Sequence, residues 1–248
     1  MQLDELEIGC CQVRRFEHRK DWAAERGVNP SVVSESLKAA HYEAILAGEG
    51  AQVPLLIGTN RDEWDLFQAG DRKAKEMGED DLRRRFARAM PEDEVDEAHA
   101  LYRKALPGLS PRRRWATFQT DRIFRAPAER LAAVHAQHNP VYGYCFTWSP
   151  RHLRRWMGAG HAMEVPLVFG TWRHPVLRAM LLGARPHSRR IQDEWIRFAR
   201  EGAPSADWSP YTEEAPSLRI LGPNDEAGVA RFDHVRAWWA ERDHGTRG

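Results

Sequence analysis

Short strand-like segments alternate with longer amphipathic stretches in this sequence, and this alternation constrains the fold more than any other feature. Residues 53–57, 141–148 and 218–221 have the length and composition of strands. Between the last two lies an apolar stripe of helical spacing that ends before Gly202 and includes Ile191, Trp195, Phe198 and Ala199. Strands separated by helices indicate an α/β fold, and the continuous apolar run at residues 53–57 is typical of a strand buried on both faces of a parallel sheet.

The other helical stretches are bounded by proline or glycine. Pro91 separates two of them, and Pro127 lies in the first turn of a new helix. We expect helices over residues 41–48, 79–90, 92–105, 115–124, 127–138, 191–202 and 232–241. Residues 1–37 lack clear periodicity and predict a poorly ordered lead-in, so the folded domain is expected to span residues 38–248.

Composition excludes several classes of function. The 248 residues carry 37 basic and 36 acidic side chains, a balance that disfavours nucleic acid or an anionic membrane as a partner. No apolar run approaches the ~18 residues of a membrane span, and the acidic N-terminus does not resemble a secretory signal. Three cysteines, of which Cys10 and Cys11 are adjacent, do not make a disulfide framework and favour a reducing, cytoplasmic setting.

Two motifs carry chemistry. Glu63 follows the first predicted strand after a polar turn, and His161 lies in a loop flanked by Gly158 and Gly160. Reactive groups in open α/β sheets lie just past the carboxyl ends of strands. A carboxylate that orients a histidine, and a histidine that takes a proton, are two of the three parts of a catalytic triad. Their order along the chain matches the α/β-hydrolases.

Each motif also has a simpler interpretation. On spacing alone, Glu63 is more often a solvated loop acid, and a histidine in a glycine-rich loop is more often structural. Glu164 is expected to buttress the histidine loop. The basic clusters at residues 112–114 and 151–155 are expected to be solvated helix faces. His135 and His138 have no evident further ligand, so we expect no metal site.

Longer segments resemble the type B carboxylesterases, which include the para-nitrobenzyl esterases and the cholinesterases. Residues 53–63, VPLLIGTNRDE, are similar to the acid motif of that family, and residues 158–170, GAGHAMEVPLVFG, to its histidine motif. Residues 120–127, 140–146 and 192–204 are similar to further family segments in the same order. The resemblance implies an α/β-hydrolase fold, a triad acid at Glu63, a general base at His161 and no cofactor.

The chain departs from the family in its nucleophile. None of its nine serines stands in a Gly-x-Ser-x-Gly elbow, and no Gly-Gly pair offers an oxyanion loop. In the family both features lie in the N-terminal half, and members are about twice as long. Residues 1–37 do not resemble the family segment that would precede residue 38, and we expect them to be a non-family lead-in. The resemblance therefore implies the C-terminal portion of an α/β-hydrolase, lacking the nucleophile-elbow half and the central strands.

Three hypotheses follow for function. The chain is a truncated carboxylesterase, inactive alone; or it is one half of a split hydrolase that needs an N-terminal half chain; or it is a non-catalytic binding module on the same scaffold. In the intact family the ligand is a small carboxylic ester. The absent central strands also predict an unpaired sheet edge through which the chain would self-associate.

Overall fold

The computed structural model describes residues 47–49, 51–222, 233 and 235–242. The chain divides into two compact units, residues 1–47 and 48–248, and the elements described here belong to the second. The expected lead-in over residues 1–37 and most of the expected helix over residues 41–48 lie outside the described residues. The domain boundary at residue 38 therefore stays a prediction.

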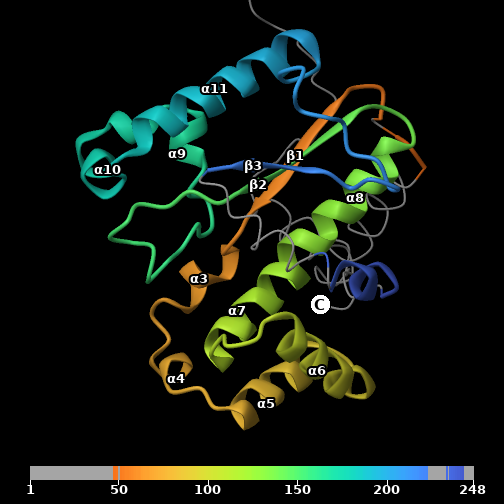
Figure 1. Cartoon of the computed structure of the whole chain (residues 1–248), viewed down its shortest axis with the longest axis vertical. Coiled ribbons are helices and arrows are strands. Elements are labelled where there is room, and N and C mark those ends of the chain that lie inside the picture. The colour runs from red at the N-terminus through yellow and green to blue at the C-terminus, as the bar shows by residue number, and fades with distance from the viewer. Residues whose placement is uncertain (1–46, 50, 223–232, 234, 243–248) are drawn as a thin grey trace, which may run out of the picture. The chain divides into compact units, whose positions relative to one another are not determined.

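The centre of the second unit is a three-stranded parallel sheet in the order β1-β2-β3 (Figure 1). The strands are β1 (Leu55–Asn60), β2 (Val141–Phe146) and β3 (Leu218–Leu221). All three predicted strands are present. The first lies two residues later than expected, because Pro54 has no N–H for the ladder and pairing starts where the Leu55 N–H donates to the Pro140 carbonyl at 3.0 Å.

The expectation that the first strand is buried on both faces is wrong for most of its length. The first four residues of β1 are only half-buried. Within the described part of the chain, β1 pairs with β2 alone and so forms an edge of the sheet.

Two helices pack on opposite faces of the sheet, α8 (Ala126–Ala136) and α11 (Ala184–Glu201). Alternate strand residues point to opposite faces. Val141 packs with Ala132 of α8, whereas the next residue, Tyr142, belongs to the cluster that includes Ile191 of α11. Ile191, Trp195 and Phe198 of the predicted stripe thus form the sheet-facing side of α11, whereas Ala199 is exposed. The helix starts seven residues before Ile191.

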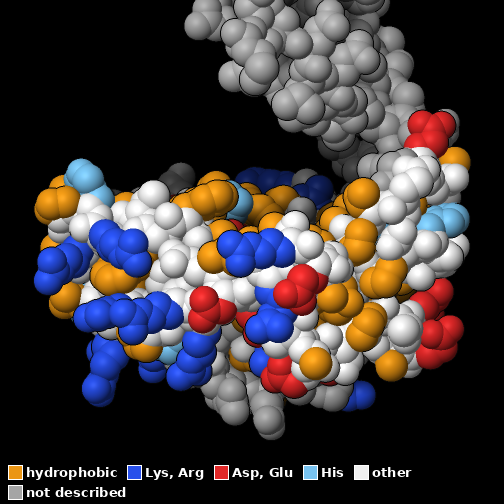
Figure 2. Space-filling view, turned by 90° about the horizontal axis from the view of Figure 1, so that it is seen from above, with side chains coloured by type: hydrophobic (Ala, Val, Ile, Leu, Met, Phe, Trp, Pro, Cys, Tyr) orange, Lys and Arg blue, Asp and Glu red, His pale blue; other side chains and the backbone are white. Residues whose placement is uncertain are grey.

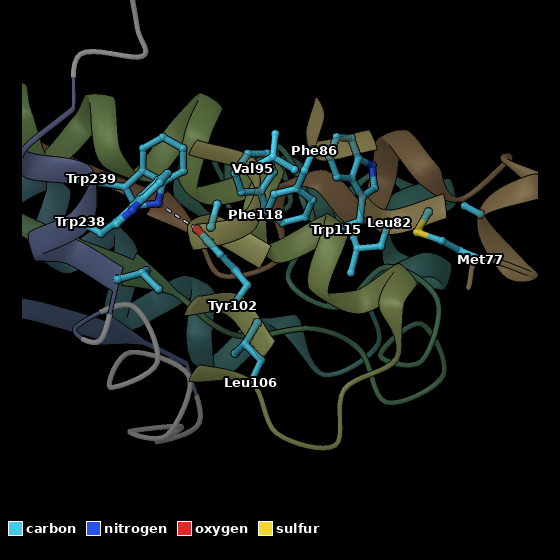
Figure 3. Close-up of a cluster of buried hydrophobic side chains, with 13 residues drawn as sticks. Met77, Leu82, Phe86, Val95, Tyr102, Leu106, Trp115, Phe118, Trp238 and Trp239 are labelled. Carbon is cyan, nitrogen blue, oxygen red and sulfur yellow. Dashed lines mark hydrogen bonds between the residues drawn. The ribbon is translucent and has the colours of Figure 1, made fainter. Parts of the chain in front are cut away.

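A second core lies among helices alone, and Figure 3 shows its side chains. Its helices are α5 (Glu79–Ala89), α6 (Val95–Ala105), α7 (Pro111–Thr120) and the C-terminal helical residues 235–240, with η1 (Glu92–Glu94) before α6. The fully buried rings of Phe86 and Phe118 lie 4.2 Å apart between centroids. The Trp239 Nε1 donates to the Tyr102 hydroxyl at 2.8 Å. The helices expected on each side of Pro91 are confirmed.

The expected break between α7 and α8 is absent. The two helices join through a wide π-helical turn, η2 (Asp121–Arg125), in which the Ala126 N–H bonds to the Asp121 carbonyl five residues back. Pro127, which has no N–H to donate, is the second residue after the wide turn. A π turn shifts the hydrogen-bond register, and this allows one continuous rod where a proline in a regular helix would clash with the preceding turn.

Short elements complete the described fold. They are α3 (Glu63–Gln68), α4 (Arg72–Lys75), α9 (Val165–Val168), η3 (Thr171–Arg173) and α10 (Pro175–Met180). Among the described helices, none combines the length and the apolar character that crossing a bilayer requires.

Candidate active site

The predicted site residues meet at the carboxyl ends of β1 and β2. The strand register places Asn60, the last residue of β1, opposite Phe146, the last of β2. Three residues beyond Asn60, Glu63 opens α3. The chain leaves β2 and returns through residues 147–160 to bring His161 to the same edge. Parallel pairing therefore makes neighbours of two segments that lie about 100 residues apart.

The structure brings Glu63 and His161 into direct contact. His161 Nδ1 lies 2.7 Å from Glu63 Oε2. The Glu63 side chain is 7% exposed and that of His161 43% exposed. The bond to Nδ1 fixes the orientation of the ring and leaves the other ring nitrogen, Nε2, for a proton acceptor role. Ala162, directly after the histidine, has a left-handed φ of +62°, a strained conformation for a residue with a Cβ.

Burial and hydrogen bonding act in opposite directions on the Glu63 carboxyl. Burial raises its pKa, and the nearby Glu164 adds to this effect, whereas the Asn60 N–H and His161 lower it. The net direction is upward. The Asn60 N–H donates to Glu63 Oε1 at 2.7 Å, so each carboxylate oxygen has its own donor, one on the backbone and one on the histidine.

Asn60 also fixes the histidine loop from the strand side. Its Nδ2 donates to the Gly160 carbonyl at 2.7 Å and to Glu164 Oε2 at 2.5 Å. One buried side chain thereby holds the residue before His161 and the helix cap after it. The expectation that Glu164 buttresses the loop is confirmed by this contact.

Asp62 holds the other end of the loop. Its N–H donates to the Ala159 carbonyl at 3.0 Å, and its Oδ2 accepts the Ala159 N–H at 2.9 Å. Gly158, with φ +53°, allows this approach, because a Cβ there would lie 2.2 Å from Asp62 Oδ2. The backbone before His161 is therefore clamped against the residue that precedes Glu63.

Arginines keep Asp62 ionised. Burial opposes the charge, but Arg61, the Ala159 N–H and Arg113 hold the pKa of the Asp62 carboxyl below its usual range. Arg61 Nη2 lies 2.9 Å and Arg113 Nη2 3.6 Å from that carboxylate, and Arg113 also pairs with the buried Asp65.

The basic cluster at residues 112–114 is not the solvated helix face that its charge suggests. Arg113 of α7 bridges to the acids that surround the site, and Arg114 is 5% exposed and paired with Glu79. The acids that neutralise this cluster come from distant segments, and for that reason the charge run alone was misleading.

Aromatic rings border the His161 imidazole. The ring centroids of Phe67 and Phe124 lie 5.3 and 5.2 Å from it. Trp148 and Trp156 lie near the histidine loop in sequence but do not border the imidazole. Trp148 is buried in the sheet core, and Trp156 is 61% exposed.

No serine in the described part of the chain hydrogen bonds to His161. Ser188, the most buried, donates instead to the Leu167 carbonyl at 2.7 Å. The described residues also include no group of three side chains that could hold a metal ion, and His135 Nε2 contacts the Val53 carbonyl at 2.8 Å.

Asn60 and Asp62 were missed as site residues by sequence reasoning. Both stand in the turn between the strand and Glu63, and a polar residue at the last position of an apolar strand was the available signal. Their partners in the histidine loop could not be identified without the pairing of β1 with β2.

The fold and this pair of side chains define a class, an α/β protein of the hydrolase type with a buried acid and a histidine at the carboxyl edge of its sheet. The carboxylesterase family profile matches residues 13–235. The chain belongs to the carboxylesterase family. The match begins inside the expected lead-in over residues 1–37.

Individual relatives agree with this assignment. The para-nitrobenzyl esterase of Bacillus subtilis is 30% identical over 198 residues, which are 77% of this chain and 39% of the relative. An acylcarnitine hydrolase of Rattus norvegicus is 27% identical over 73% of this chain and 35% of its own length. Among solved structures, a carboxylesterase of Geobacillus stearothermophilus superposes with a TM-score of 0.61 at 28% identity, over 76% of this chain and 42% of that one. The chain thus spans about two fifths of the length of these three relatives.

Proposed function

We propose that this chain supplies the acid and the base of a carboxylic ester hydrolase. The observation that carries the proposal is the 2.7 Å bond between His161 Nδ1 and Glu63 Oε2, at the edge of the sheet where α/β enzymes place reactive groups. Family membership supports ester hydrolysis as the reaction class.

In this proposal the roles are those of an acyl-transfer triad. A serine hydroxyl attacks the ester carbonyl carbon, and its proton passes to His161 Nε2. The proton then goes to the alcohol oxygen as the ester C–O bond breaks, and water releases the acyl group by the same two steps. Glu63 fixes the tautomer of His161 and stabilises the imidazolium that forms in each step.

The serine and the oxyanion donors would come from a segment outside these 248 residues. None of the nine serines has an elbow sequence, and the relatives are much longer than the part matched here. Among the described elements β1 pairs with β2 alone, so the central strands of such a segment would pair with the other side of β1. We therefore propose that the chain is inactive alone, because loss of a triad nucleophile costs about 10⁶ in rate.

Complementation in trans tests this proposal. The full chain is co-expressed with the N-terminal part of the Bacillus subtilis para-nitrobenzyl esterase that its match leaves out, and hydrolysis of a short-chain nitrophenyl ester is followed. We expect activity from the pair and none from either part. His161→Gln should abolish the activity of the pair, whereas His152→Gln, in an exposed turn of the same excursion, should preserve it.

Two results would contradict the proposal. Activity that survives His161→Gln would assign the base elsewhere. A stable complex of the two parts that never turns over ester would favour the non-catalytic binding module.

We also propose a reducing, cytoplasmic setting, on the basis of an odd number of cysteines with two adjacent. Imaging of the tagged full chain in its host tests this, and secretion would contradict it.

A further inference from the structure

Beyond the ester chemistry, the arginines of α10 and α11 have no role in the site. From Val165 to Gln192 the chain has five arginines and no Asp or Glu. Figure 2 shows blue side chains gathered on the left of the view, the side on which Figure 1 places α10 and the start of α11.

A hollow of about 420 Å³ lies among these arginines. Four of its six lining residues are arginines, and all four are exposed. The lining residues are Trp172, Arg173, Arg178, Arg185, Ser188 and Arg189. Three separate elements contribute guanidinium groups to one space: η3, α10 and α11.

The wall behind the arginines is fixed. Trp172 Nε1 donates to Ser188 Oγ at 2.8 Å, and Ser188 Oγ donates to the Leu167 carbonyl at 2.7 Å. Gln192 Nε2 donates to the same carbonyl at 3.1 Å. These bonds join η3, α9 and α11, so the arginines extend from anchored backbone.

The charge of the hollow is not neutralised by the protein. No carboxylate in the described part of the chain forms an ion pair with the four arginines, in contrast to Arg113 and Arg114 on α7. Arg185 and Arg189 stand at i and i+4 on one helix face, where like charges repel. An anion from solution would relieve this repulsion.

We propose that this hollow binds a small phosphate-bearing anion with more than one charged group. A guanidinium offers paired N–H donors that match phosphate oxygens two at a time. Four guanidinium groups around a space of this size suit two linked phosphates better than a single one. The site is separate from Glu63 and His161 and does not depend on ester hydrolysis.

Calorimetric titration of the full chain with inorganic pyrophosphate tests the proposal, with orthophosphate titrated in parallel. We expect saturable binding that is tighter for pyrophosphate and weakens as salt is added. The double variant Arg185→Gln/Arg189→Gln should bind about tenfold more weakly or worse, as expected for loss of charge-assisted hydrogen bonds.

The matched control is Arg197→Gln/Arg200→Gln. It removes the same charge from exposed positions of the same helix outside the hollow, and it should bind pyrophosphate within about twofold of the parent. Circular dichroism of each variant checks that the helix content is kept.

Absence of saturable binding, or equal weakening by the control pair, would overturn the proposal. A third arm uses phosphatidic acid vesicles with phosphatidylcholine vesicles as reference. Binding to the acidic vesicles that pyrophosphate does not compete away would also overturn it, since the arginines would then serve a lipid surface.

Discussion

At the scale of single residues, the position of His161 depends on what holds the backbone just before it. Asp62 bonds to both backbone groups of Ala159, and Asn60 holds the Gly160 carbonyl. The two residues that hold the loop flank Arg61 in the turn that leads to Glu63. The same short turn therefore presents the acid and sets the distance from the acid to the base.

Gly158→Ala tests this arrangement. The new methyl group would clash with the Asp62 carboxylate. The backbone of residue 158 would also have to keep a φ near +53°, which is strained for alanine. We expect a loss of about 1–3 kcal/mol in the free energy of unfolding, from backbone strain and the displaced carboxylate. Urea denaturation gives this value, and faster amide exchange at Ala159 would report the opened clamp.

Gly70→Ala is the matched control, because Gly70 has nothing within 4 Å of an added Cβ and no positive φ. We expect a change within about 0.5 kcal/mol there. If the two variants have equal stability, the clamp does not depend on Gly158.

At the scale of elements, the π turn between α7 and α8 holds a buried ion pair. Asp121 bonds to Arg125 at 2.5 Å and accepts from the Tyr102 hydroxyl at 2.7 Å. Arg125 also donates to the Arg61 carbonyl at 3.1 Å, so this turn supports the strand end next to the site. Burial raises the pKa of Asp121 to about 6, against the opposing effects of Arg125 and Tyr102.

This shift predicts a pH dependence of stability. The folded carboxyl holds its proton up to about pH 6, whereas the reference value is 3.8. The contribution of Asp121 to stability is therefore fully present below about pH 4 and is lost as the pH rises through about 6. The free energy of unfolding of the parent minus that of Asp121→Asn should be smaller at pH 7.5 than at pH 4.5.

Asp121→Asn should still cost about 1–3 kcal/mol, because the amide NH2 group cannot accept the hydrogen bond that the Tyr102 hydroxyl donates to Asp121 Oδ2. Asp193→Asn, at an exposed position of α11, serves as the control and should not show a difference that falls with pH. A difference for Asp121 that grows with pH would contradict the raised pKa.

Sequence patterns identified elements better than their junctions. The strands β2 and β3 and the helices α5 and α6 followed directly from periodicity and from Pro91. The π turn was missed, since Pro127 alone indicates the start of a new helix. The shifted hydrogen-bond register that lets the rod continue, and the buried Asp121–Arg125 pair within it, are seen only in the structure. Glu63 and His161 were found from motif resemblance, whereas their contact with Asn60 and Asp62 depends on strand register, which one sequence does not specify.

At the scale of the whole molecule, β1 is an edge among the described elements, and an edge strand offers backbone groups to other chains. We expect the full chain to self-associate as its concentration rises, measured by sedimentation velocity. Val53, just before β1, is 62% exposed, and Val53→Lys should reduce the association, because a charge beside an edge opposes strand pairing.

Val176→Lys is the matched control for this edge. Val176 is 61% exposed but lies on α10, away from the strand edge. Association that falls equally in both variants would point to general apolar contact, and a strictly monomeric parent chain would refute the expectation.

The excursion from β2 to His161 is anchored by hydrogen bonds at its two ends. The Thr147 N–H bonds to the Leu221 carbonyl at 3.1 Å, and the Asp62 clamp closes the other end at Ala159. The turn between them, with Arg151, His152 and Trp156 at its surface, is exposed. We expect a reporter peptide inserted in this turn to leave the base in place, because the bonds that hold the two ends of the excursion lie outside the turn.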